Sequence, residues 1–227
     1  MVKWLLIFLC LLLLVPIIEV ASVRFINPPC TMPMMLHRAR GILSNSQHSP
    51  LQYQYVNLNG IPVMFLKHLW ISEDERFFQH NGFDWKQIDI AIKQAERKGE
   101  PVRGASTITM QCARSLFLWQ GRSWIRKGLE ACYTVLMELF LSKQRIMELY
   151  ANVIEMGDGI YGVEAAAKHY YGVPAKSLTR GQSAMLAALL PNPTGWNPIN
   201  PGPTLLHRQQ SILERAKTTR FPANLLQ

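Results

Sequence analysis

The chain begins with an apolar run that is too long for an ordinary core helix. Every residue from Trp4 to Ile18 is apolar, and tolerating Glu19 extends the run through Val23. About 20 such residues span the hydrocarbon layer of a bilayer, which is ~30 Å thick. The run therefore predicts a single transmembrane helix over residues 1–23, with the rest of the chain exported.

A cleaved signal peptide is the alternative for this segment. Residues 20–22, Val-Ala-Ser, have the small-residue pattern of a processing site. Glu19 at that junction and the long Leu-rich run favour retention as an anchor. Lys3 and Arg24 flank the run, so the flanking charges barely set its orientation.

The remaining sequence predicts one mainly α-helical domain. Residues 24–52 are rich in proline with few periodic apolar residues, which is typical of a juxtamembrane linker. Tyr53 then opens a short extended piece, and a domain over residues 53–227 follows in which apolar residues recur at helical spacing. The expected helices begin at Pro62, at Trp85, near Ser106, at Trp124 and after Ser142, and the one from Trp85 ends before Gly99. Further helices are expected between Gly162 and Gly172, from Thr179 to Pro191 and over Leu205–Ala216.

The formal charge of +9 at pH 7 indicates an anionic partner or surface. Nucleic acid is not expected, because export is predicted and no recognition motif is present. An anionic membrane surface or a phosphorylated substrate fits better. The cysteines lack metal-ligand spacing, so a zinc site is not expected, and Cys112 and Cys132 are expected as buried thiols rather than as a disulfide.

Glu73 is the polar misfit on an apolar helical face that it shares with Leu69 and Trp70. A carboxylate held against such side chains is poorly hydrated, which suits it to accept or donate a proton near neutral pH. The open alternative is a helix that restarts at Ser72. In that case Ser72 and Glu75 would form a capping box, and Glu73 would be an ordinary carboxylate turned to water.

A glycine turn and a polar helix follow at residue 104. If Ser106 caps this helix, its free backbone N–H groups favour an anion. Thr107, Gln111 and Arg114 would share one face of it. Residues 114–127 then contain basic and bulky apolar side chains but no acidic one, which predicts a surface that meets both phosphate and lipid. The basic residues of this segment are Arg114, Arg122, Arg126 and Lys127.

Glu130 follows this basic segment. Its spacing from Lys127 and Arg126 fits helical ion pairs, each worth only about 0.3–0.5 kcal/mol. Taken together with Glu73, it offers a second carboxylate for the same cleft. His80 is expected to be a structural hydrogen-bonding residue.

Five blocks occur in order over residues 72–172. They are Glu73-Asp-x-x-Phe77-x-x-His80-x-Gly82-x-Asp84, Gly104-x-Ser-Thr-Ile-x-x-Gln111, Arg126-Lys-x-x-Glu130, Lys143-x-x-Ile-x-x-x-Tyr150-x-Asn152 and Gly162-Val-x-Ala-Ala-x-x-x-Tyr-Tyr-Gly172. Together they resemble the lysozyme-like peptidoglycan glycosyltransferases of bacteria. The chain ends soon after the likeness does, so a transpeptidase domain is not expected.

The resemblance implies a lysozyme-like fold and lipid II as substrate. Glycan bound to undecaprenyl pyrophosphate would be the donor, and the 4-hydroxyl of lipid II the acceptor. Glu73 would be the general base, with Glu130 assisting near the leaving pyrophosphate. No cofactor is certain, although a divalent cation such as Mg²⁺ could take part. The residues implied to hold the donor's phosphates and sugar are Ser106, Gln111, Arg114, Arg122 and Lys127.

The same likeness implies a bacterial inner-membrane location with the catalytic domain in the periplasm, and other cell-wall synthesis proteins as potential partners. Met110 departs from the family pattern, which has Gln there, and Arg114-Ser115 replaces Lys-Asn. Because Arg keeps the charge but not the geometry of Lys, donor affinity or processivity could differ.

Two other functions compete with this one. A lysozyme-like hydrolase or lytic transglycosylase would cut finished glycan with one Glu, but its substrate has no phosphate for the basic segment to bind. A membrane-anchored scaffold would need neither Glu73 nor Glu130.

Overall fold

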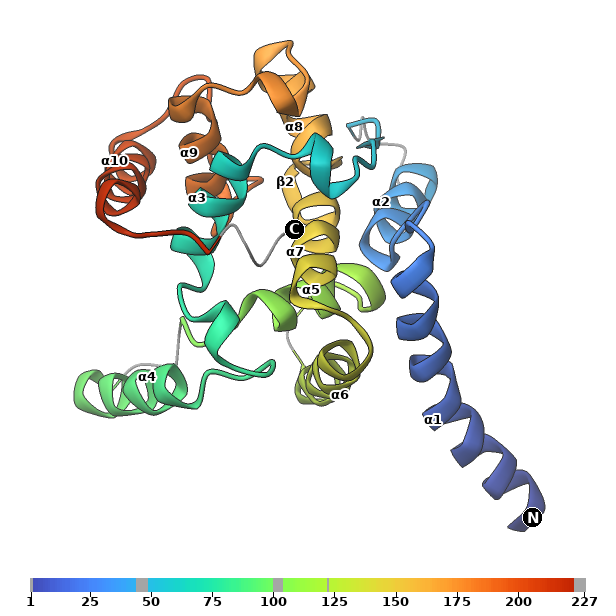
Figure 1. Ribbon diagram of the computed structural model, residues 1–227. Coiled ribbons are helices and arrows are strands. Elements are labelled where there is room, and N and C mark those ends of the chain that lie inside the picture. The colour runs from blue at the N-terminus through green and yellow to red at the C-terminus, as the bar shows by residue number, and fades with distance from the viewer. Residues whose placement is uncertain (1, 44–48, 100–103, 122, 223–227) are drawn as a thin grey trace.

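Helices make up most of the molecule, as the sequence predicts (Figure 1). The computed structural model describes residues 2–43, 49–99, 104–121 and 123–222, with side chains for all of these except residues 2 and 5–13. The helices are α1 (Val2–Phe25), α2 (Met32–Leu43), α3 (Val63–Glu73), α4 (Trp85–Lys98), α5 (Ile108–Phe117), α6 (Trp124–Phe140), α7 (Lys143–Val153), α8 (Val163–Tyr171), α9 (Arg180–Leu189) and α10 (Pro203–Thr218). The strands are β1 (Gln52–Tyr53), β2 (Glu155–Gly157) and β3 (Ile160–Tyr161).

The first helix, α1, extends away from the rest of the molecule at its N-terminal end and packs on α6 nearer its C-terminal end (Figure 1). Val20 and Val23 are buried in the core, and Glu19 accepts a hydrogen bond from the hydroxyl of Tyr133. The apolar run expected to form the anchor lies largely in residues 5–13, outside the described side chains. Among the described residues, no helix combines the length and hydrophobicity needed to span a membrane.

The segment expected to be a linker contains α2. This helix packs on α5, and Met34 is fully buried. Pro33 lies in its first turn, where a missing N–H is tolerated, so the prolines that indicated a linker do not prevent a helix. The core therefore also includes residues N-terminal to residue 53, whereas the sequence led us to expect it within residues 53–220.

The core is built where α5 packs on α7 and α3 packs on α9. Ile146, Leu149 and Tyr150 of α7 are fully buried at helical spacing. Asn152, also buried, accepts a hydrogen bond from the backbone N–H of Val56 and donates one to its carbonyl, at 2.8 and 2.9 Å. This pairing ties the segment before α3 to the end of α7.

Several helix boundaries lie where the sequence predicts them. Ser142 caps α7, and Thr179 and Gln182 form a capping box at the start of α9. Gly99 ends α4 in the left-handed conformation, with φ of +64°, which glycine adopts without strain. These ends are determined by local chemistry, which is why sequence alone locates them.

The extended piece at Tyr53 is confirmed as β1, the edge of a small sheet of order β1-β3-β2. β1 runs parallel to β3, with Tyr53 opposite Tyr161. Strands β2 and β3 have two or three residues each, too few for an alternating pattern to reveal them. Cys112 and Cys132 are free thiols, and Cys112 is buried as expected, but Cys132 is exposed.

His68 lies at the contact between α3 and α9 and makes the stability of the protein depend on pH. Its Nδ1 lies 2.9 Å from the Ser183 hydroxyl, and burial, with the charges of Arg180 and Lys67, lowers the pKa of His68 from 6.5 to about 4. The unfolded chain binds a proton at this site below about pH 6.5, whereas the folded chain does so only near pH 4, so stability falls in that window as pH falls.

We therefore expect this residue to lower the free energy of unfolding by about 2–3 kcal/mol between pH 7.5 and pH 4.5. Urea unfolding at the two pH values measures the change. A His68→Asn variant, which cannot bind the proton, should lack this part of the pH dependence. An identical pH dependence in both proteins would contradict the prediction.

Candidate active site

Glu73 is the last residue of α3, and Asp74 is its C-cap. The helix therefore ends here and does not restart at Ser72, so the capping-box alternative is wrong. The Ser72 hydroxyl instead lies 3.0 Å from Glu73 Oε1 and 3.2 Å from the carbonyl oxygen of Ala187. Its single proton can serve one of these acceptors at a time. The half-buried carboxylate is thus held partly by its own helix and partly against α9.

Gln111 of α5 holds the other carboxylate oxygen. Its Nε2 donates to Glu73 Oε2 at 3.0 Å, and its Oε1 accepts from the Tyr150 hydroxyl at 2.8 Å. Glu73 therefore lies at the junction of α3, α5 and α9. Tyr150 belongs to one of the five sequence blocks, but no pattern in the sequence predicts its contact with Gln111.

Glu73 and Ser106 line a common cavity of about 240 Å³, the Glu73 pocket. Its lining residues are Ile71, Ser72, Glu73, Asp74, Glu75, Arg76, Gln87, Gly104, Ala105, Ser106 and Arg215. Arg215 comes from α10, and its guanidinium forms an ion pair with Glu75 at 2.8 Å. This pocket thus joins the glycine turn before α5 to a helix near the end of the chain.

The N-terminus of α5 departs from the sequence-based expectation. Thr107, not Ser106, caps the helix, by accepting a hydrogen bond from the N–H of Met110. Asp74 Oδ2 accepts from the N–H of Ile108 at 3.1 Å. An acidic residue of the chain itself therefore takes the place expected for an anionic ligand at this helix end.

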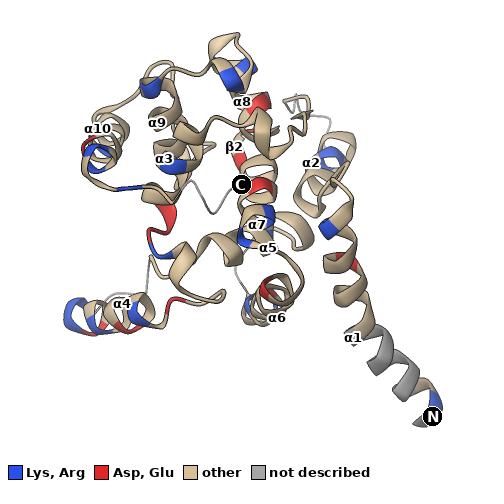
Figure 2. Ribbon diagram, viewed as in Figure 1, with Lys and Arg blue, Asp and Glu red and all other residues tan. Residues whose placement is uncertain are grey.

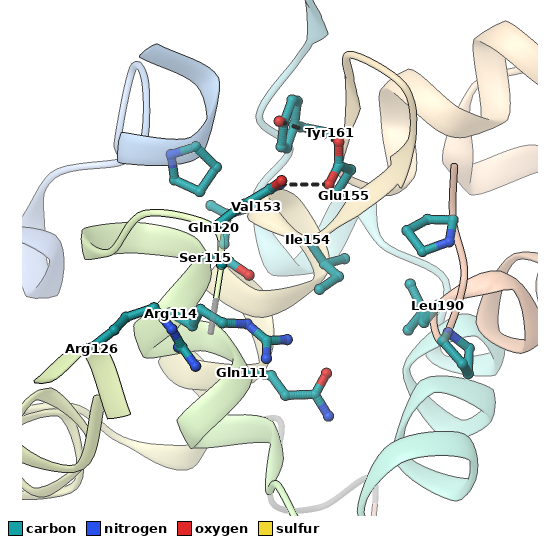
Figure 3. A pocket seen from close by; sticks show the side chains of 14 residues that line it. Gln111, Arg114, Ser115, Gln120, Arg126, Val153, Ile154, Glu155, Tyr161 and Leu190 are labelled. Carbon is teal, nitrogen blue, oxygen red and sulfur yellow. Dashed lines mark hydrogen bonds between the residues drawn. The ribbon is translucent and has the colours of Figure 1, made fainter. Parts of the chain in front are cut away.

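Gln111 also lines a second cavity, of about 430 Å³, which we call the arginine pocket (Figure 3). Its lining residues are Pro33, Gln111, Arg114, Ser115, Gln120, Gly121, Arg126, Val153, Ile154, Glu155, Tyr161, Leu190, Pro191 and Pro193. Arg114 is half-buried, and among the described residues no Asp or Glu forms an ion pair with it. An unpaired, partly desolvated guanidinium is a ready partner for a phosphate.

Glu130 is 1% exposed and lines neither pocket. Arg126 Nη1 donates to its Oε2 at 2.5 Å, and Lys127 pairs with its Oε1. The predicted ion pairs are thus present; the Arg126–Glu130 pair is buried, whereas the Lys127 side chain is 41% exposed. Glu73 lines the smaller of the two pockets, and Glu130 lines neither of them.

Arg126 was not among the residues expected to hold the donor's phosphates and sugar, but the structure places it at the arginine pocket. It is 7% exposed, it lines the arginine pocket, and its Nε has no hydrogen-bond partner in the described structure. Lys127, which was expected there, pairs with Glu130 and does not line the pocket. Arg122 lies outside the described residues. Arg114 and Arg126 both fit the predicted phosphate-binding chemistry. Which of Arg126 and Lys127 lines the pocket depends on the orientation of α6, which the sequence does not show.

The opposite wall of the arginine pocket carries an acidic group. Glu155 Oε2 accepts a hydrogen bond from Gln120 at 2.7 Å, and burial raises the pKa of Glu155 (Figure 3). Tyr161 stands beside it, with its hydroxyl 3.5 Å from Glu155 Oε1. The pocket thus has a cationic side and a side of hydrogen-bonding groups. No pattern in the sequence predicts this second side.

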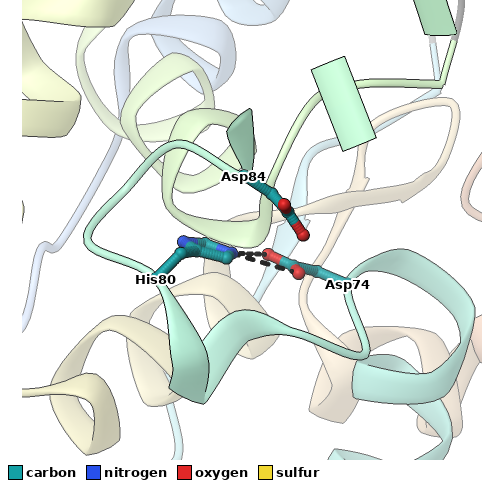
Figure 4. A group of neighbouring side chains, drawn as sticks. All are labelled: Asp74, His80 and Asp84. Atoms are coloured by element: carbon teal, nitrogen blue, oxygen red, sulfur yellow. Dashed lines mark hydrogen bonds and ion pairs between the residues drawn. The ribbon is translucent and has the colours of Figure 1, made fainter. Parts of the chain in front are cut away.

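His80 is confirmed as a structural hydrogen-bonding residue, and it belongs to a cluster that deserves comparison with a metal site. One ligand atom from each of Asp74, His80 and Asp84 lies within 4.8 Å of the others (Figure 4). Asp74 is engaged by His80 Nε2 at 3.0 Å and by a backbone N–H of α5. Asp84 caps α4 and pairs with Arg76 at 2.9 Å.

These contacts do not fit Mg²⁺. That ion prefers near-octahedral oxygen ligands, whereas here one ligand is an imidazole and both carboxylates are already engaged by protein donors. The cluster also includes Arg76, whose positive charge opposes a cation. We assign it to holding the end of α3, the start of α4 and the start of α5 together.

A positioned carboxylate beside a cation-lined pocket has the parts of an enzyme that transfers a group from a phosphorylated donor. Comparison with known proteins agrees, since the sequence profile of the transglycosylase family matches residues 40–217. A biosynthetic peptidoglycan transglycosylase of Caulobacter vibrioides is 44% identical over 87% of this chain and 82% of its own length. Proteins of the same name from Xylella fastidiosa (42% identical; 90% and 84%) and Aeromonas hydrophila (44%; 88% and 83%) are similarly close.

The chain therefore belongs to the transglycosylase family, together with the biosynthetic peptidoglycan transglycosylases, and is a glycosyl-transferring enzyme. The family membership that the five sequence blocks indicated is confirmed.

Proposed function

We propose that this enzyme polymerises lipid II into β-1,4-linked glycan strands with release of undecaprenyl pyrophosphate. Glu73 takes the proton from the 4-hydroxyl of the acceptor as that oxygen bonds to the anomeric carbon of the donor. The bond from that carbon to the pyrophosphate oxygen breaks, and the pyrophosphate leaves with the electron pair. The donor is the growing glycan on its lipid pyrophosphate.

The observation that carries this proposal is the position of Gln111. It lines the arginine pocket and also donates to the carboxylate of Glu73, so a proton acceptor and an anion-binding pocket meet at one side chain. Pyrophosphate in the pocket would face the side chains of Arg114 and Arg126. Fixed cations at the leaving group stabilise the charge that develops in the transition state.

We assign Glu130 a supporting part in this reaction. Its buried carboxylate holds Arg126 through Nη1 and so helps to fix a side chain that lines the arginine pocket. An acid that also neutralises Lys127 reduces repulsion between the two adjacent cations. Glu130 therefore contributes to the leaving-group site through Arg126 and not by contact with substrate.

Incubation of the purified full-length protein with labelled lipid II tests the function. Polymer should accumulate, and undecaprenyl pyrophosphate should be released in step with it. A protein that leaves lipid II unchanged but shortens finished glycan would be a hydrolase or lytic enzyme. A protein that does neither would contradict any catalytic role.

Membrane association is the second part of the proposal, with α1 as a single-span anchor and the catalytic domain in the periplasm. The segment around Leu116 was expected to meet lipid, but Leu116 and Leu118 are buried. Instead, α6 carries an uncharged exposed stripe in which Trp124 is 90% exposed. Its other apolar members are Ile125, Val135 and Leu139.

Helix α4 offers a second surface of this kind. Trp85 and Ile92 are exposed on it, and basic residues including Lys93 and Arg97 occur along the same helix (Figure 2). Apolar side chains flanked by cations suit an anionic membrane surface.

The N-terminus of the native protein checks the anchor. Val20 and Val23 are core residues, so cleavage at residues 20–22 would remove part of the packing between α1 and α6. We expect N-terminal sequencing of membrane-extracted protein to begin at residue 1 or 2. A start near Ser22 would show a cleaved signal peptide and defeat the anchor, though not the enzymatic proposal.

A further inference from the structure

The side-chain amide of Gln111 has its orientation set by three neighbours. Nε2 donates to Glu73 Oε2 at 3.0 Å and lies 3.5 Å from the carbonyl oxygen of Ser106. Oε1 accepts from the Tyr150 hydroxyl at 2.8 Å. A carboxylate and a carbonyl can only accept, so both require the NH₂ group on their side, and a donating hydroxyl requires the oxygen on the other. All three contacts select the same orientation.

Tyr150 is placed to act on Gln111 and on no substrate. Its side chain is fully buried on α7, and it lines neither the arginine pocket nor the Glu73 pocket. Among the described residues, Gln111 is the one hydrogen-bond partner of its hydroxyl. Burial raises the pKa of Tyr150 well above 10, with the nearby charge of Glu73 adding, so the hydroxyl keeps its proton and remains a donor.

Without that donor the amide would lose the partner that holds its Oε1 side, although Glu73 would still disfavour the flipped orientation. Rotation by 180° would turn Oε1 toward Glu73 Oε2, and two acceptors facing each other repel. A released amide would nevertheless be free to move away from the carboxylate, because its other partner, the carbonyl of Ser106, is at the limit of hydrogen-bonding distance.

We propose that Tyr150 is a positioning residue that fixes the Gln111 amide with its N–H toward Glu73. Oε2 of the base is thereby held, and Oε1 is left for the acceptor hydroxyl when Ser72 turns its proton to the carbonyl of Ala187. This inference rests on the proposed role of Glu73 as the general base.

Tyr150→Phe in the full-length protein is the first test, with polymerisation of lipid II as the assay. Loss of one neutral hydrogen bond predicts a fall in kcat of roughly five- to tenfold, while KM for lipid II stays unchanged. The acid limb of the pH–rate profile should move to higher pH, because the ionised carboxylate loses a well-aimed donor.

Tyr170→Phe is the matched control. The Tyr170 hydroxyl donates to the carbonyl of Met156 at 2.9 Å, away from Gln111, so its loss also removes a partly buried hydrogen bond. It should leave kcat and the pH profile unchanged. Equal kinetic losses in the two variants would show a general loss of packing and would overturn the proposal.

A double-mutant cycle shows whether Tyr150 acts through Gln111. In a Gln111→Ala background, followed under single-turnover conditions, Tyr150→Phe should change the rate less than twofold. A full five- to tenfold loss in that background, or no loss in the native background, would overturn the positioning role. Activity retained by Glu73→Gln would instead refute the proposed base, so the two failures are distinguishable.

Discussion

Replacing Glu73 by Gln is expected to abolish glycan polymerisation while leaving the protein folded. The amide keeps the size of the side chain and can still interact with Ser72, but it cannot accept a proton at working pH. Loss of a general base typically lowers the rate by about 10²–10⁴, which corresponds to roughly 3–5 kcal/mol of transition-state stabilisation. The rate of polymer formation from labelled lipid II measures the effect.

The control for lost charge is Glu214→Gln, which removes an acidic group that forms a surface ion pair with Lys217. It should retain near-native activity. Matching thermal unfolding curves for the two variants would exclude misfolding as the cause. If Glu73→Gln kept most of its activity on lipid II, Glu73 would have no place in the mechanism.

Removing the guanidinium of Arg114 is expected to weaken engagement of the donor. Arg114 lines the arginine pocket and has no acidic partner among the described residues. No carboxylate of the protein therefore neutralises its positive charge, which can act in full on a bound pyrophosphate. A charge-assisted hydrogen bond contributes roughly 1.5–3 kcal/mol, so Arg114→Ala should lower kcat/KM by about tenfold or more. Steady-state kinetics with lipid II give this ratio.

Two further variants are needed to interpret the result for Arg114→Ala. Lys176→Ala removes a positive charge from an exposed position outside both pockets, and should have little effect. Arg114→Lys should be far milder than Arg114→Ala, because the family pattern has Lys at this place. An equal loss in both Arg114 variants would show that a point charge is not enough, and would cast doubt on the alignment of this position with the family.

The sequence by itself determined most of the helical framework and the family. Ser142 and Thr179 cap their helices by accepting hydrogen bonds from N–H groups three residues away, so residue order fixes them. The blocks containing Glu73, Gln111 and Arg114 also indicated acid–base chemistry next to phosphate binding. These inferences depend on residue type and on short spacings, which the linear sequence contains.

Only the tertiary structure decided how these residues are used. Asp74 closes the N-terminus of α5 because the end of α3 lies against it, and no spacing between residues 74 and 108 encodes that approach. Arg126 faces the arginine pocket while Lys127 does not, because the rotation of α6 about its axis is set by its packing against α1 and α5. Neighbouring residues on a helix differ by about 100° in direction, so that rotation selects between them.

Packing between distant segments of the chain also explains the position of Tyr150. It meets Gln111 because α5 and α7 pack together, and the two residues are 39 positions apart in the chain. Similarly, Glu155 joins the arginine pocket from a strand too short to be recognised by its pattern. Local propensity and capping form the helices, whereas long-range packing brings Glu73, Gln111 and Tyr150 into one chain of hydrogen bonds.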